Sequence, residues 1–133
     1  MVGRWYNNAA IMVERNNHGH AILLWLAQNS RLRVLRGHDD KPGWLSSSLG
    51  KILLYNIAAD ALRNAEIVLH DFVTTTQLHA IESATLLAPR GEHDDAADAF
   101  ALACCGRSQA LTWSFDAIGG AGKRGESRWR VPE

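Results

Sequence analysis

The first third of the chain alternates between short apolar runs and polar breaks. The run AAIMV (9–13) stops abruptly at ERNN, and because paired asparagines break regular structure, this pattern favours a strand over a helix. HAILLWLAQN (20–29) has the length of a helix, whereas RLRVLRG (31–37) partly alternates and predicts a second strand, ended by Gly37. A strand, a helix and a strand in this order predict a crossover unit with parallel strands.

The middle of the chain carries the clearest helical periodicity. Ser46 to Ser48 supply an N-cap for a helix that covers 51–63. Its apolar positions recur at helical spacing and are Leu54, Ile57, Ala58, Ala61, Leu62 and Ala65. This spacing predicts an amphipathic helix of about four turns. Further on, 67–70 predicts a short strand, and 74–87 predicts a third helix with a threonine cap.

The last predicted helix, DDAADAFALACC (94–105), opens with acids and is almost wholly apolar after its first turn. A helix that is apolar all round is buried, and Gly106 is expected to end it. The chain therefore divides into one domain over 1–105 and a C-terminal extension over 106–133. The end of this extension (116–133) is Gly-rich and basic, which predicts a mobile tail.

Composition narrows the class of protein without identifying a partner. The 133 residues suit one domain with a modest core, and the balance of 14 basic and 14 acidic side chains argues neither for nor against a nucleic-acid partner. Cys104 and Cys105 are adjacent, and we interpret them as small apolar residues in a reducing compartment. No apolar run approaches the roughly 18 residues of a membrane span, and the N-terminus lacks a signal-peptide layout. These features predict a soluble cytoplasmic protein.

Two groups of acidic residues are candidates for a site that binds a metal ion. Glu14 follows the first predicted strand, at the carboxyl end where open α/β sheets carry their ligands, although a solvent-facing acid is the alternative. Asp94 and Asp95 open the last helix, with Asp98 one turn further on. One carboxylate suffices to cap a helix, whereas a hard divalent cation needs several converging oxygen ligands. Glu14 and Asp94 can converge on one cation if the helix packs against the sheet.

Several segments of the chain together resemble one protein family. YNNAAIMVERNNHGHAIL (6–23) resembles a segment of bacteriophage terminase large subunits, in their C-terminal nuclease domain. GWLSSS (43–48), the helix over 51–63 and GEHDDAADAFALA (91–103) match the same family in the same order and at similar spacing. The resemblance covers roughly residues 5–105, and its strength lies in the combination of motifs.

The resemblance implies a fold and an activity. The fold is ribonuclease H-like, a mixed central sheet flanked by helices, and the activity is metal-dependent cleavage of concatemeric double-stranded DNA during genome packaging. The family's site holds two Mg²⁺ or Mn²⁺ ions with three acidic residues. By motif, Glu14 takes the place of the second acid and Asp94 that of the third, with Asp95 as a further or alternative ligand. The implied partners are the small terminase subunit and the portal protein, in the cytoplasm of a bacterial host.

Several further residues are candidates for contact with DNA. Asn16, Asn17 and Gly19 lead into a helix N-terminus, whose backbone N–H groups could face a phosphate. A tight strand-to-helix turn is the alternative explanation for Gly19. Lys51 matches a position that is often basic in the family and is a candidate for the DNA backbone, with a solvated lysine as the alternative.

The chain also departs from the family pattern. The family's first acid should precede Glu14 by several dozen residues, but only MVGRWYNNAAIMV (1–13) precedes it, and this segment contains no acid. The opening strands of the sheet and the ATPase domain have no counterpart either, so we expect a truncated fold and impaired cleavage by this chain alone. Two alternatives to an active nuclease segment stay open: a non-catalytic prophage remnant and an unrelated α/β interaction module.

Overall fold

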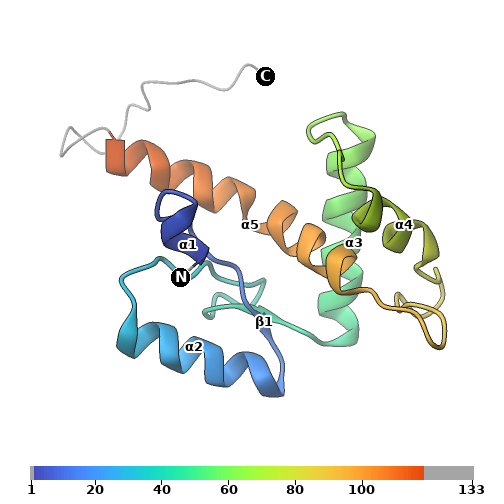
Figure 1. Ribbon diagram of the computed structural model, residues 1–133, viewed down its shortest axis with the longest axis horizontal. Coiled ribbons are helices and arrows are strands. Elements are labelled where there is room, and N and C mark those ends of the chain that lie inside the picture. Colours follow the sequence, from blue (N-terminus) through green and yellow to red (C-terminus); the bar gives the residue numbers. More distant parts are fainter. Residues whose placement is uncertain (1, 119–133) are drawn as a thin grey trace.

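The computed structural model describes residues 2–118, which form a mixed α/β fold (Figure 1). Its elements in chain order are α1 (Val2–Trp5), β1 (Glu14–Arg15), α2 (Asn17–Asn29), β2 (Trp44–Leu45), α3 (Ser48–Arg63), α4 (Phe72–Ala80) and α5 (Asp95–Ile118). β1 and β2 form a two-stranded parallel sheet, in which Glu14 is paired with Trp44 and Arg15 with Leu45. The α/β class expected from the sequence is therefore confirmed.

The parallel arrangement continues on the N-terminal side of β1. Ile11 bridges Val34 in the parallel sense, and the backbone N–H of Leu35 donates to the carbonyl oxygen of Ile11 at 2.8 Å. Because α2 connects the two bridged segments, the strand–helix–strand crossover predicted from the sequence is confirmed in its topology.

The predicted extents of the strands are wrong. β1 covers Glu14–Arg15 rather than 9–13, and 31–37 contributes only isolated bridges. One of these bridges joins Arg36 to Pro42, and proline has no N–H with which to continue a ladder. The predicted strand at 67–70 does not form, and these residues are an irregular connection between α3 and α4.

The hydrophobic core lies between β2, α3 and α5. Its buried residues are Trp44, Leu54, Ala58, Ala61, Ala101, Leu102 and Cys104. The predicted amphipathic helix is confirmed as α3, whose core residues are three or four positions apart and therefore share one face. Of its predicted apolar positions, however, Ile57 and Leu62 are exposed and Ala65 lies beyond the end of the helix. Its serine cap is confirmed as well, because the Ser47 hydroxyl accepts a hydrogen bond from the N–H of Gly50 at 3.0 Å.

The third predicted helix is shorter than expected and begins differently. α4 starts at Phe72 and ends at Ala80, whereas 74–87 was the expected range. Its cap is Asp71 rather than a threonine, because the Asp71 carboxylate accepts from the backbone N–H and the hydroxyl of Thr74, both at 2.7 Å. A carboxylate satisfies two donors at once, which explains why it takes the capping position.

The last helix is longer and less buried than the sequence predicts. α5 does not end at Gly106 but continues to Ile118. A Cβ on Gly106 would lie 2.6 Å from Leu35 Cδ1, so the glycine lets α5 approach the segment over 31–37 rather than terminating the helix. Ala99 and Ala103 are exposed, so α5 is buried along one face only. The rest of the predicted tail, 119–133, lies outside the described residues.

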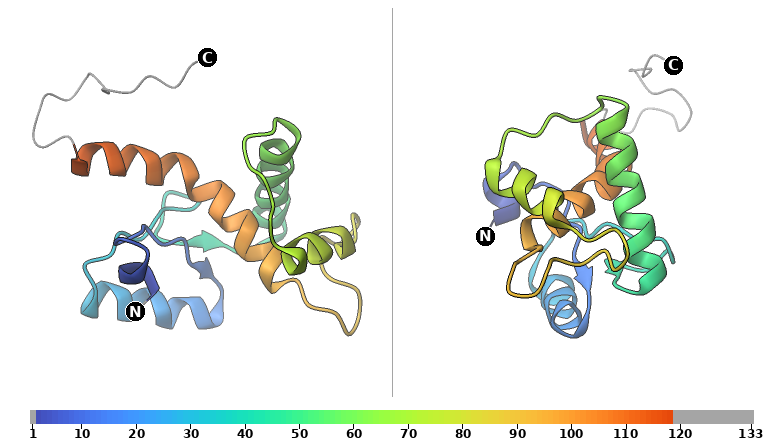
Figure 2. Two further views of the ribbon diagram at one scale, coloured as in Figure 1. Left: turned by 45° about the horizontal axis from the view of Figure 1, so that its top comes forward. Right: turned by 90° about the vertical axis from the view of Figure 1, so that its right-hand side faces the viewer.

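α5 contacts α3 and α4 at one end and the segment around Arg36 towards the other. α3 and α4 pack against its first half, and α2 lies away from both of them (Figures 1 and 2). Towards its second half, the Gln109 side chain accepts from the backbone N–H of Arg36 at 3.1 Å and donates to the Arg36 carbonyl at 2.9 Å. Within residues 2–118, no helix combines the length and the apolar character that a membrane span requires.

Candidate functional site

Glu14 is the first residue of β1 rather than the residue that follows a strand, as was predicted, and two side chains hold its carboxylate. The Ser46 hydroxyl donates to Glu14 Oε1, and the Asn16 amide donates to Glu14 Oε2 at 3.0 Å. Ser46 directly follows β2, the strand paired with β1, so the carboxylate is oriented from both strand ends. Its half-buried position differs from the freely solvated acid that was the alternative for Glu14.

The turn after Glu14 is also the start of α2. The Asn16 side chain accepts from the backbone N–H of Gly19 at 2.9 Å and so caps the helix. A Cβ on Gly19 would lie 1.8 Å from the carbonyl oxygen of Glu14, which leaves room for glycine only. This close approach supports the tight strand-to-helix turn as the reason for Gly19. The side chain of Asn17 lies outside the described residues.

A second polar cluster joins α3 to the beginning of α5. Lys51 Nζ lies 3.4 Å from Asp94 Oδ2 and 3.1 Å from Asp98 Oδ2. The Tyr55 hydroxyl donates to Asp98 Oδ1 at 2.5 Å. Lys51 and Tyr55 are four positions apart on α3, as Asp94 and Asp98 are around the start of α5. Residues four apart share a helix face, so the packing of α3 on α5 brings two matched pairs together.

The two adjacent aspartates at the start of α5 face in different directions. The side chain of Asp94 is 26% exposed and contacts Lys51. That of Asp95 is 92% exposed, with only the His93 ring 3.9 Å away. Of the two predicted ligands, Asp94 therefore belongs to the cluster and Asp95 faces solvent.

The pKa of the Tyr55 hydroxyl is raised by burial and by acids from distant segments of the chain. Burial and the hydrogen bond to Asp98 raise the pKa of its hydroxyl far above the ordinary value of 10.0. The negative charges of Asp98, Asp94 and Glu14 raise this pKa further.

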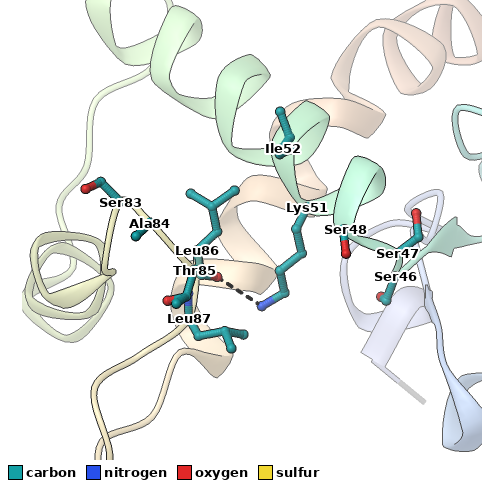
Figure 3. Close-up of a pocket in the computed structure, with 10 residues that line it drawn as sticks. All are labelled: Ser46, Ser47, Ser48, Lys51, Ile52, Ser83, Ala84, Thr85, Leu86 and Leu87. Atoms are coloured by element: carbon teal, nitrogen blue, oxygen red, sulfur yellow. Dashed lines mark hydrogen bonds between the residues drawn. The ribbon is translucent and has the colours of Figure 1, made fainter.

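A cavity of about 460 Å³ lies between the beginning of α3 and the loop over 83–87 (Figure 3). It is lined by residues 46–48, 51–52 and 83–87. Ser46, which binds Glu14, and Lys51, which binds Asp94, both line it. Figure 3 shows the Lys51 side chain directed towards the loop at Leu86, whose carbonyl oxygen is 3.4 Å from Nζ.

The side chains present do not by themselves fit a two-metal centre. Among residues 2–118, no group of three or more His, Cys, Asp and Glu side chains is gathered closely enough to hold a metal ion. Both oxygens of Glu14 accept hydrogen bonds, and the Lys51 ammonium lies against Asp94 and Asp98. A hard divalent cation requires several oxygen ligands converging at close range, which this arrangement does not provide.

Sequence reasoning missed the residues that hold the acids in place. Ser46 was expected only as a helix cap, Tyr55 was not singled out, and Lys51 was expected to contact DNA or solvent. The available signal was the i, i+4 spacing of Lys51 and Tyr55, which matches that of Asp94 and Asp98.

Comparisons with protein-family models, with curated proteins and with solved structures found no match to this chain.

Proposed function

We propose that this chain is part of a metal-dependent DNA endonuclease with a ribonuclease H-like fold. More specifically, we propose that it belongs to the nuclease domain of a bacteriophage terminase large subunit, which cuts concatemeric DNA in the host cytoplasm together with a small subunit and a portal protein. The order and spacing of the sequence motifs support this proposal. The observation that carries it is that Ser46, which binds Glu14, and Lys51, which binds Asp94, line the same cavity, although the two acids come from distant parts of the chain.

The proposal gives each acid a role. In this proposal, Glu14 and Asp94 would be two of the three acids that hold Mg²⁺ or Mn²⁺, and the bound ions would supply activation of water and stabilisation of the leaving oxygen. Asp95 is the weaker candidate because its side chain projects into solvent. The resemblance assigns two of the family's three acids to positions of this sequence, Glu14 and Asp94.

The chain's own residues orient the acids and provide polar groups for DNA. Ser46 and Asn16 fix the Glu14 carboxylate through hydrogen bonds to its two oxygens. The hydroxyl-rich segment 46–48 and Lys51 line the cavity beside these acids and offer donors to a phosphate backbone.

A second candidate function is a non-catalytic prophage remnant that retains only weak contact with cations or DNA. The observation that favours it is the ion pairing of Lys51 with Asp94 and Asp98, together with the lack of a three-ligand group within residues 2–118. In this case the folded acidic cluster persists as a structural ion-pair network.

A plasmid-nicking assay separates these two candidates. The full chain is incubated with supercoiled plasmid and Mn²⁺ or Mg²⁺, and the nicked product is quantified on gels for the wild type, Glu14→Gln and Asp94→Asn. We expect chelation to abolish nicking and each substitution to slow it by about 100-fold or more, because both remove a proposed metal ligand.

Asp60→Asn is the matched control for this assay. Asp60 is an exposed acid on α3 that pairs only with Arg63, so its neutralisation should leave nicking unchanged. Equal nicking by the wild type and Glu14→Gln would contradict the proposal. No nicking by any protein would support the non-catalytic remnant.

A further inference from the structure

The start of α5 is capped differently from the starts of α2, α3 and α4. In those three helices, the side chain just before the helix accepts from the N–H of the third helical residue. In α5 the third residue is Ala97, and its N–H donates to the side-chain oxygen of Gln77 at 3.2 Å. The N–H of Ala96 donates to the same oxygen at 2.7 Å. A side chain from α4 therefore caps α5.

Asp94 is the residue that would ordinarily provide this cap. It directly precedes α5, and aspartate is among the preferred capping residues. Its carboxylate contacts other segments instead, because Oδ2 lies 3.4 Å from Lys51 Nζ and accepts from the backbone N–H of Ala88 at 3.4 Å. The two N–H groups that would draw this carboxylate onto the helix are already bonded to Gln77.

We propose that Gln77 is a positioning residue, which caps α5 in place of Asp94 and so keeps the Asp94 carboxylate turned towards Lys51. An amide oxygen can satisfy two N–H groups because it has two lone pairs. The consequence for DNA cleavage rests on the proposed function, in which Asp94 is one of the acids. The capping arrangement itself does not depend on that function.

The surroundings of Gln77 make this exchange of caps possible. α4 packs against the beginning of α5 and brings the half-buried Gln77 side chain to its first turn (Figures 1 and 2). Ala97 is fully buried, so its N–H cannot turn to water if Gln77 is removed. The Asp94 carboxylate can then take over the cap by rotating its side chain, with the loss of its contact with Lys51.

Hydrogen exchange followed by NMR tests this arrangement without metal or DNA. The rates of the Ala96 and Ala97 amides are compared in the wild type, Asp94→Ala, Gln77→Met and the double variant, with the Ala101 amide of the same helix as reference. We expect Asp94→Ala alone to leave both rates unchanged, because Gln77 provides the cap. In the Gln77→Met background, Asp94→Ala should raise both rates about fivefold, because Asp94 has become the cap.

Gln77→Glu is the matched control, because it keeps a side-chain oxygen at the same position along the side chain. In this background, Asp94→Ala should again leave the Ala96 and Ala97 rates unchanged. A merely structural role of Gln77 predicts that Asp94→Ala changes these rates by the same factor in all three backgrounds. That result would overturn the inference.

A measurement on the wild type applies if Gln77→Met does not fold. NMR scalar couplings across hydrogen bonds connect the amide nitrogen of the donor to the carbonyl carbon of the acceptor. We expect such a coupling between the Ala96 amide nitrogen and the side-chain carbonyl carbon of Gln77. A coupling to the carboxyl carbon of Asp94 in its place would overturn the inference.

Plasmid nicking separates this inference from the proposed function. The expected exchange rates without nicking by any protein would support Gln77 as the cap and contradict the nuclease. Nicking that depends on Glu14, combined with equal effects of Asp94→Ala on exchange in all three backgrounds, would support the nuclease and overturn the role of Gln77. If both hold, Gln77→Met should slow nicking and Gln77→Glu should restore it.

Discussion

The two strand-to-helix junctions of the molecule are built in the same way. After β1, the Asn16 side chain accepts from the N–H of Gly19 at 2.9 Å, and after β2, the Ser47 hydroxyl accepts from the N–H of Gly50 at 3.0 Å. In each junction, the cap and the glycine are three positions apart. A Cβ on Gly19 would lie 1.8 Å from the carbonyl oxygen at the start of β1, and one on Gly50 would lie 2.1 Å from that at the end of β2. Both helices therefore turn back sharply onto the strands that precede them.

The helices that follow these junctions differ in what covers them. α3 buries one face against α5 and contributes to the core. Among the described apolar side chains of α2, only Leu26 is buried, and Ile22, Leu24 and Trp25 are 52%, 60% and 48% exposed. Local capping and a close glycine contact therefore define where each helix starts. How much a helix contributes to stability depends instead on the partner that packs on it.

Replacing the junction glycines should have the largest effect on stability. In Gly19→Ala and Gly50→Ala, the new Cβ meets backbone oxygen, which cannot move without opening the turn. We expect the free energy of unfolding to fall by about 2 to 3 kcal/mol in each variant, despite the better helix propensity of alanine. Urea unfolding followed by circular dichroism measures this change.

Gly106→Ala is the matched control for the junction glycines. Its Cβ would meet the end of the flexible Leu35 side chain, so we expect a change within about 1 kcal/mol of the wild type. The shared junction geometry would be refuted if Gly19→Ala were tolerated as well as Gly106→Ala.

Removing the caps should have a smaller effect and should distinguish the two junctions. Asn16→Ala and Ser47→Ala each lose a helix cap, which costs about 1 kcal/mol in urea unfolding. Asn16→Ala should cost more than Ser47→Ala because it also removes a hydrogen bond to Glu14. Asn16→Ser keeps a capping hydroxyl and should recover most of the loss. If Asn16→Ser were as unstable as Asn16→Ala, contact with Glu14 rather than capping would dominate this junction.

The smallest effect concerns how a helix cap depends on pH. The caps after β1 and β2 are neutral, whereas the cap of α4 is a carboxylate and can therefore lose its charge in acid. Hydrogen bonds from the side chain and the backbone of Thr74 lower the pKa of Asp71 below its ordinary value of 3.8. A carboxyl group with a lowered pKa in the folded state stabilises fully above its unfolded value and loses this contribution as the pH falls through the folded pKa. We therefore expect the Thr74 amide signal to shift only in this acidic range. The Gly50 amide, measured in the same NMR titration, is the reference. A Gly50 shift with the midpoint of Thr74 would show general unfolding rather than loss of one cap.

Local patterns predicted the parts of this fold that depend on neighbouring residues. The one-sided apolar spacing and the serine cap of α3 lie within a few turns of chain, and both were predictable. The extents of the strands were not, since a strand ends where its partner stops pairing, and the partner of Ile11 is Val34, on the far side of α2 in the chain. Gly106 was misjudged for the same reason, because its neighbour Leu35 comes from a remote segment.

The candidate site was likewise predictable only where it depends on neighbouring residues in the sequence. Glu14 and Asp94 could be selected from their positions at the ends of elements. The contact between Lys51 and Asp94 could not, because it depends on how α3 crosses α5. The exposure of Asp95 also depends on the rotation of α5 about its axis, which the sequence of the helix alone does not specify.

The hydrogen bonds between Gln109 and the backbone of Arg36 have a mechanical consequence. They fasten α5 to the segment beside β1, while the acidic start of the same helix is fastened to α3. A continuous helix transmits tilt along its length like a stiff rod, so a partner that pulls on the Gln109 end would also change the spacing between Asp94 and Glu14.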